Sequence, residues 1–409
     1  MTSSFDSKAK EESQRALCPV CGVESVHAYS PKNSYVGLEI YVCPTCELVH
    51  STRLREARAY SELSTQAASL SCDADYSTGR VGKEQMTRDN TRLFGHELRA
   101  LRPTSVLDVA AARGHFLQFA SKEFGGPALH AMDPNPELLG DTASVLDVEI
   151  LVQDFRNDLN AKRFDLIYSC HSLEHYRNPL EQLGFIKKHL AEEGRAVIDV
   201  PDFDCLDLET PIDEFFYDQH RTYFSCRTLK ACLTTVGLRA RRIEHFGGSL
   251  KALVTHDNCQ QEEVHECPLP GLEAPLEKIR RYAKSLKLCR DALPRTVREI
   301  NMERGFVGPL VAIGAGRILD AAVRYGNLHL NDFELIVDSF LYNLTAGTDE
   351  TRIVSFKSFC EMKFHNTPLC IIFANSSTDQ IKEELKAAFP EAKVIAFRDV
   401  LFKTLRTVS

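Results

Sequence analysis

Two pairs of cysteines in the first fifty residues have the spacing of metal ligands. The pairs are Cys18-Pro-Val-Cys21 and Cys43-Pro-Thr-Cys46. A Cys-x-x-Cys turn directs two thiolates at one ion, and two such turns complete a tetrahedral four-thiolate site with no open position. We therefore predict a structural Zn²⁺ ion held by Cys18, Cys21, Cys43 and Cys46. Redox activity of one pair is the alternative, but no strand–helix–strand pattern of the thioredoxin kind surrounds either pair.

A second group of residues has the arrangement of a nucleotide site. Residues 105–117 combine an apolar run, a turn of small residues and the start of a helical pattern. At the carboxyl end of a parallel strand, such a turn lets the backbone approach a ligand closely. Two later apolar runs end at Asp133 and Asp154, whose carboxylates we expect to meet ribose hydroxyls and an adenine amino group. The predicted cofactor residues in the turn are Asp108, Ala110, Ala112 and Gly114.

A single histidine, His220, lies in a segment that is rich in aromatic residues, 215–225. Aromatic neighbours exclude water from an imidazole, which favours its neutral form and leaves it usable as a base. The segment follows a predicted strand that ends at Pro201 and precedes the glycine pair Gly247-Gly248. We therefore expect His220 to act as a general base.

The composition excludes several classes of protein. The chain has 409 residues, of which 44% are hydrophobic and 26% charged, and this is typical of a soluble protein with two or three domains. No apolar run approaches the roughly 20 residues of a membrane helix, and the polar N-terminus does not resemble a secretory signal. A net charge of −8 argues against nucleic acid as the main partner. We expect a cytoplasmic protein that binds neither nucleic acid nor membrane.

The turn and the elements after it resemble class I methyltransferases that depend on S-adenosyl-L-methionine (SAM). Residues 108–114 are similar to the first motif of that family, and Leu173-Glu174-His175 with Asn178-Pro179 is similar to its fourth. The resemblance covers residues 84–255 and implies SAM as the cofactor. It adds to the expected cofactor-binding residues Phe155, His171 and Leu173.

Most of the chain resembles sugar C-methyltransferases, in which a zinc domain precedes the methyltransferase domain and a Rossmann-like domain follows it. The resemblance is carried by residues 75–79, 217–225 and 247–251. It implies a nucleotide-linked 4-keto-deoxysugar as acceptor, methylated at the carbon beside the ketone through an enolate. The catalytic residues that it implies are His220 as the base, with Tyr217, Tyr76 and Gln219.

Three positions depart from the family patterns. Ala110 and Ala112 stand where glycines are usual, and alanine resists the positive φ that such a turn favours. Gln219 stands where the family has a glutamate, so the amide can orient His220 but supplies no charge.

The predicted fold class is therefore α/β. Its parts are a Rossmann-like class I methyltransferase sheet, an N-terminal zinc-ribbon-like module and a second, C-terminal Rossmann-like domain. The expected segments are a disordered lead-in (1–15), the zinc-binding module with a connecting segment (16–83), the SAM-dependent domain (84–256), a linker and long helix (257–305), and the C-terminal domain (306–409). That last domain either helps to form the acceptor site or is a structural remnant.

Three other functions fit parts of the pattern. An O- or N-methyltransferase acting on another small metabolite would use the same fold. A zinc-ribbon protein that binds or methylates RNA is disfavoured by the charge and by the lack of a basic, aromatic-interleaved patch. A catalytically silent zinc-binding scaffold would explain the two alanines and Gln219.

Overall fold

The protein divides into two compact units, each with its own sheet. The computed structural model describes residues 16–32, 34, 37–51, 83–134, 136–151, 159, 161–212, 214–217, 219–257, 274–302, 308–339, 352–374 and 378–407. The first unit consists of Met1–Leu206 and Phe216–Ile279, and the second of Asp207–Phe215 and Arg280–Ser409. None of the helices in these described ranges is both long and apolar enough to cross a membrane.

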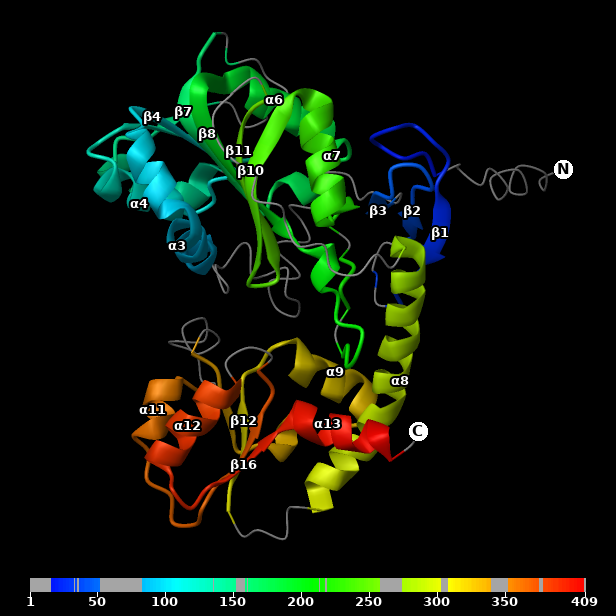
Figure 1. Ribbon diagram of the computed structural model, residues 1–409. Coiled ribbons are helices and arrows are strands. Elements are labelled where there is room, and N and C mark those ends of the chain that lie inside the picture. The colour runs from blue at the N-terminus through cyan, green and yellow to red at the C-terminus, as the bar shows by residue number, and fades with distance from the viewer. Residues whose placement is uncertain are drawn as a thin grey trace, which may run out of the picture. The chain divides into compact units, whose positions relative to one another are not determined.

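A seven-stranded sheet forms the centre of the first unit (Figure 1). Neighbouring strands from β6 to β8 pair in parallel, whereas β11 and β10 add an antiparallel hairpin beside β8. The central strands β4 and β7 are buried along almost their whole length because both faces of the sheet are covered. The predicted α/β fold is confirmed. In spatial order the strands are β10 (Leu238–Phe246), β11 (Ser249–His256), β8 (Leu190–Pro201), β7 (Phe164–Cys170), β4 (Ser105–Val109), β5 (Ala128–Met132) and β6 (Glu149–Ile150).

Helices pack on both faces of this sheet. On one face, α3 and α4 bury Phe94 and Phe116 against strand residues such as Val106. On the other face, α6 and α7 bury Leu183 and Leu229 in a core that also includes Cys18 and Cys43 of residues 16–51, the cysteine segment. The helices are α3 (Lys83–Leu101), α4 (His115–Glu123), α5 (Asp141–Val145), α6 (Pro179–His189) and α7 (Cys226–Val236), with the 3₁₀ turns η2 (Pro136–Leu139), η3 (Leu173–His175) and η4 (Phe203–Cys205).

The cysteine segment forms a small antiparallel sheet with a strand from far along the chain. Its order is β1-β2-β3-β9, in which β9 is a two-residue strand that begins two residues after His220. The register pairs Val49 with Tyr223 and His50 with Thr222. The first cysteine pair is followed by Gly22 at φ 73°, which allows the tight turn. The strands are β1 (Val26–Tyr29), β2 (Ile40–Val42), β3 (Val49–Ser51) and β9 (Thr222–Tyr223).

The second unit contains a five-stranded parallel sheet. Its first strand in the chain, β12, lies in the centre, and the later strands add outward on both sides, which is the doubly wound arrangement. Residues 207–215 belong to this unit, where Ile212 is buried in its core and Asp207 pairs with Arg398. The strands are β14 (Ile353–Val354), β13 (Leu335–Val337), β12 (Leu310–Ile313), β15 (Leu369–Ile372) and β16 (Lys393–Ala396). The helices are α8 (Pro275–Met302), which belongs to this unit from Arg280 onward, α9 (Arg317–Gly326), α11 (Phe356–Cys360), α12 (Thr378–Ala388) and α13 (Phe397–Arg406), with the 3₁₀ turn η5 (Leu330–Asp332).

Candidate functional site

The turn between β4 and α4 has the backbone geometry of a nucleotide-binding turn. Ala110, Ala112 and Gly114 all have positive φ, at 59°, 48° and 72°. The turn is tied to the next strand, because the amide of Ala111 donates to the Met132 carbonyl at 3.1 Å. Gly114 caps α4, and a Cβ at this position would lie 2.9 Å from Thr142. The two alanines therefore adopt the conformation that glycine would adopt with less strain.

Two of the three acidic residues predicted for the cofactor, Asp108 and Asp133, lie at the same edge of the sheet. Asp108 is buried near the end of β4. Asp133 is buried just after β5, and its Oδ2 accepts a hydrogen bond from the Ala112 amide at 2.7 Å. Asp133 thus holds the turn in place, while its contact with a ribose stays a prediction. Asp154 and Phe155 lie outside the described residues.

His171 lies directly after β7, beside the turn that follows β4. Its φ is 46°, and its amide donates to the Asp199 carbonyl at 2.8 Å. The ring lies among polar groups: Nε2 is 3.1 Å from Ser249 Oγ, and Nδ1 is 3.5 Å from a carboxylate oxygen of Glu174. Leu173 is fully buried in η3. Because β4 and β7 are parallel neighbours, the structure brings His171 and Leu173 to the edge where the cofactor turn lies.

His220 is buried and is held by its backbone. The Oγ of Ser51 in β3 donates to the His220 carbonyl at 3.0 Å, and the His220 amide donates to the Tyr217 carbonyl at 3.1 Å. The ring centroids of Tyr217 and Tyr223 lie 5.3 Å and 5.8 Å from that of His220. Burial holds the pKa of His220 well below its ordinary value of 6.5, and the nearby imidazoles of His175 and His171 add to the effect. His220 is therefore neutral at neutral pH.

Glu174 and His175, to which the sequence interpretation gave no role, lie beside His220. One ligand atom from each of these three residues lies within 4.8 Å of the other two. The Glu174 carboxylate is buried, and one of its oxygens is 3.8 Å from His175 Nε2. The His175 and His220 rings meet edge to face at 5.0 Å. A carboxylate is thus supplied near His220 by Glu174, although Gln219 carries none.

Of the predicted catalytic residues Gln219 and Tyr76, the structure describes only Gln219. The Gln219 carbonyl oxygen lies 3.3 Å from His175 Nδ1, so the backbone of this residue takes part in the site. Tyr76 lies outside the described residues. The sequence signal for Glu174 was present in the Leu173-Glu174-His175 motif, but the motif does not say toward which residue the carboxylate points.

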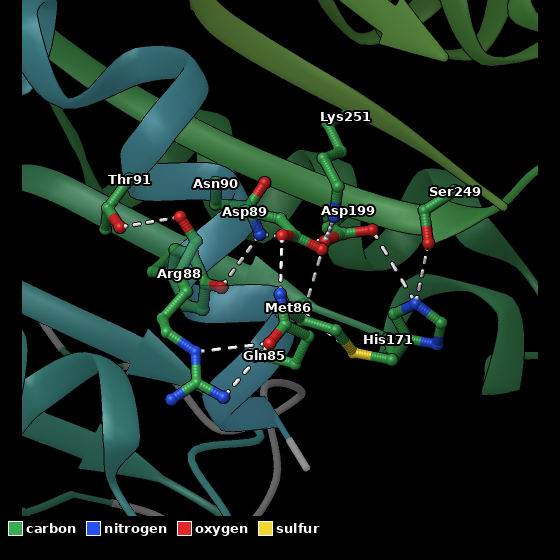
Figure 2. Close-up of polar contacts among 12 residues, drawn as sticks. Gln85, Met86, Arg88, Asp89, Asn90, Thr91, His171, Asp199, Ser249 and Lys251 are labelled. Atoms are coloured by element: carbon green, nitrogen blue, oxygen red, sulfur yellow. Dashed lines mark hydrogen bonds and ion pairs between the residues drawn. The ribbon is translucent and has the colours of Figure 1, made fainter. Parts of the chain in front are cut away.

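Figure 2 shows a buried polar network beside His171. Asp199, in β8, has a fully buried side chain that pairs with Lys251 in β11, itself only 1% exposed. Asn90 of α3 donates to the same carboxylate at 2.7 Å and to the Tyr168 hydroxyl at 2.9 Å. The other Asp199 oxygen is 3.6 Å from His171 Nε2. A buried ion pair is strongly destabilised when one partner is removed, so this network holds β8, β11 and α3 in register near the site.

The four predicted zinc ligands come together at one point. Their Sγ atoms are 3.5 Å apart for Cys18 and Cys46, 3.4 Å for Cys21 and Cys43, and 3.8 Å for Cys21 and Cys46. Four sulfurs around one zinc at 2.3 Å would be about 3.8 Å apart, so the cluster fits the ion closely. Burial raises the pKa of Cys18 to about 11. Burial also opposes ionisation of Cys43, but the amides of Cys46 and Thr45 lower its pKa to about 7.

The positive φ of Ala112 leads to a stability prediction. Ala112→Gly should stabilise the turn against local opening by about 0.5–1 kcal/mol, because the relief of left-handed strain exceeds the extra unfolded-state entropy of glycine. Ala111→Gly is the control: Ala111 is buried and is not among the positive-φ residues, so this change should destabilise the turn. Hydrogen exchange of peptides from β4 and α4, read by mass spectrometry, measures both effects. Faster exchange in Ala112→Gly would contradict the strained geometry.

A comparison with protein-family models finds a match in part of the chain. Residues 82–243 match the family model described as a methyltransferase domain. No curated protein matches the chain. A SAM-dependent methyltransferase from Clostridium acetobutylicum is similar in structure, with 15% identity over 48% of this chain and 99% of that chain, and a TM-score of 0.35.

Two further solved structures have similarly low sequence identities and TM-scores. One is a 1,6-didemethyltoxoflavin-N1-methyltransferase from Burkholderia thailandensis, with 18% identity, coverage of 56% of this chain and 96% of that chain, and a TM-score of 0.38. The other is LepI in complex with SAM, with 17% identity, coverage of 37% of this chain and a TM-score of 0.32; this chain spans only 42% of its length. At these values the similarities say nothing about the acceptor. The family model identifies a methyltransferase domain in residues 82–243.

Proposed function

We propose that this protein is a SAM-dependent methyltransferase that methylates a carbon next to a ketone, in a nucleotide-linked deoxysugar or a similar small molecule. The observation that carries the proposal is the neutral, buried His220 beside Glu174 and His175. A carbon acid needs a base that is unprotonated at neutral pH, whereas transfer to an oxygen or nitrogen nucleophile demands less of the protein. The acceptor is proposed to be a small molecule, because the site is built from buried side chains.

The turn after β4 supports SAM as the cofactor. Its positive-φ residues present backbone to a ligand, and Gly114 leaves no room for a side chain beside Thr142. Asp133 fixes the turn through Ala112 and stands at the end of β5, where a ribose would lie. SAM bound there supplies an electrophilic methyl group.

The residues around His220 support enolate formation. His220 would take the proton from the carbon beside the ketone, and the Glu174 carboxylate would stabilise the imidazolium that results. The aromatic rings of Tyr217 and Tyr223 restrict water around the base. The hydroxyl of Tyr217 is the proposed hydrogen-bond donor to the developing oxyanion, a role in which Tyr76 is also proposed.

A mass-spectrometric assay in D₂O tests this reaction. The protein with bound zinc and SAM should add one methyl group to a nucleotide-linked 4-keto-deoxysugar and admit solvent deuterium at the same carbon. His220→Asn should lower the rate by about a hundredfold or more, because removal of a general base costs this much. His27→Asn, at an exposed histidine of β1, is the control and should leave the rate unchanged. Methylation of oxygen or nitrogen without deuterium entry would contradict C-methylation while keeping the methyltransferase.

The pH dependence follows from the lowered pKa of His220. Because the folded pKa lies well below 6.5, the base stays unprotonated as the pH falls to 6.5, and activity is lost only at lower pH, through the folded pKa. We expect kcat/KM for deuterium entry to stay flat as the pH is lowered to roughly 6.5, where an ordinary histidine would be half protonated. A half-maximal rate near pH 6.5 with a substrate that does not titrate there would contradict the lowered pKa of His220.

We also propose that Cys18, Cys21, Cys43 and Cys46 hold a structural zinc ion. The sulfur separations support it, and so does the closed four-thiolate set, which leaves no position for a substrate. The ion would fix β3, whose partner strand β9 begins two residues after His220. Zinc therefore has a positioning role here and takes no part in the chemistry.

Cys21→Ser should release this zinc and loosen the pairing of β3 with β9. The expected results are a loss of bound zinc, measured by elemental analysis, and faster hydrogen exchange at Val49 and Thr222. Cys360→Ser, at a partly exposed cysteine of α11, is the control and should keep the metal. Full zinc content in Cys21→Ser would argue against the four-thiolate site.

A further inference from the structure

A third set of metal-ligating side chains lies outside the cysteine module and outside the His220 cluster. Its members are Asp202, Cys205 and His245, and one ligand atom from each lies within 4.8 Å of the other two. Asp202 follows β8, Cys205 ends the 3₁₀ turn η4, and His245 lies near the end of β10. All three belong to the first unit.

The Asp202 carboxylate is the centre of this set. Its side chain is fully buried, and its Oδ2 lies 2.5 Å from His245 Nδ1 and 2.9 Å from Cys205 Sγ. The other oxygen, Oδ1, accepts from the Asp204 amide at 2.8 Å, which fixes the orientation of the carboxylate. One oxygen thus faces a sulfur and a ring nitrogen at the same time.

The backbone around the set is held by several elements. The Asp202 amide donates to the Gly248 carbonyl at 3.0 Å, and the Phe203 amide donates to the Phe224 carbonyl at 2.9 Å. Lys278 closes the other side of η4, because its Nζ donates to the Phe203 and Asp204 carbonyls at 3.0 Å and 2.7 Å. Lys278 lies 5.0 Å from the Phe203 ring, so its charge is directed at the backbone and the ring. These hydrogen bonds fix the backbone around Asp202 before any ion binds. Cys205 is exposed and the His245 side chain is 20% exposed, so both side chains have room to move.

We propose that Asp202, Cys205 and His245 form a binding site for a divalent transition-metal ion, with Zn²⁺ as the best fit. One thiolate, one imidazole and one carboxylate are the donor types that zinc binds, and three protein ligands leave a fourth position for water or another small ligand. Such ligands would lie about 3.3–3.8 Å apart around zinc, so Cys205 and His245 need to move away from Asp202 by about 1 Å. The site goes beyond the proposed methyl transfer, which does not use it.

The protons balance in a simple way. Without an ion, the thiol proton of Cys205 and the Nδ1 proton of His245 are directed at Asp202. Binding of Zn²⁺ releases the thiol proton to solvent. The imidazole of His245 loses its Nδ1 proton to solvent and takes one up on Nε2, so Nδ1 is free to bind the ion and one proton is released in all. The two negative charges of thiolate and carboxylate then offset the charge of the ion, which makes burial of Asp202 favourable.

Cobalt binding tests the site in protein whose four-cysteine module already holds zinc. Added Co²⁺ should give a thiolate-to-cobalt charge-transfer band and the visible bands of a four-coordinate ion. Cys205→Ala should abolish the charge-transfer band. His245→Gln should weaken cobalt binding by at least ~10–100-fold, which is the loss seen when a residue that only hydrogen-bonds to a metal ligand is replaced. Cys360→Ala is the matched control and should bind cobalt as the unaltered protein does.

Native mass spectrometry with added Zn²⁺ gives a second measurement. The unaltered protein should carry one ion more than Cys205→Ala, and circular dichroism of that variant checks that it folds. Equal zinc content in the two proteins, or cobalt bands that Cys205→Ala leaves unchanged, would overturn the proposal and leave a hydrogen-bonded cluster only. Neither measurement uses methyl transfer, so failure here is distinguishable from failure of the proposed function.

Discussion

The pairing of β3 with β9 is the constraint on which the geometry around His220 depends. It joins Val49 to Tyr223 and His50 to Thr222, so the cysteine segment at one end of the chain fixes the residues next to His220. Ser51 adds a hydrogen bond to the His220 carbonyl itself. Two paired residues make a weak strand on their own, and they persist because the surrounding core includes Cys43 and Phe224. A metal ion in the four-cysteine site would therefore act on His220 through the backbone.

The parallel arrangement of β4, β5 and β7 explains why the other site residues meet at one edge. The carboxyl ends of parallel strands lie side by side, so the turn at Ala112, the carboxylate of Asp133 and the ring of His171 come together. Three residues there, Ala110, Ala112 and His171, have positive φ. Strained backbone is kept where surrounding hydrogen bonds over-determine it, and such places are often functional.

Two buried carboxylates of the first unit, Asp199 and Asp202, are surrounded by partners. Asp199 is paired with Lys251 and accepts from Asn90. Asp202 accepts from its own 3₁₀ turn and faces His245. Low dielectric surroundings strengthen each of these interactions and also lower the pKa of His220. The buried polar groups thus hold the strands in register, whereas burial and the nearby imidazoles of His175 and His171 set the protonation of the base.

The sequence by itself determined the features that arise from local spacing. These are the two Cys-x-x-Cys pairs, the small-residue turn after β4, the acid after β5 and the single histidine among aromatic residues. Periodicity and spacing are local properties, so they can be recognised without knowing which strands are neighbours. Only the tertiary structure decided that Glu174 lies beside His220, that Lys251 pairs with Asp199, and that Cys205 meets His245. Those contacts depend on strand order and register, because residues far apart in the chain become neighbours only when the sheet is assembled.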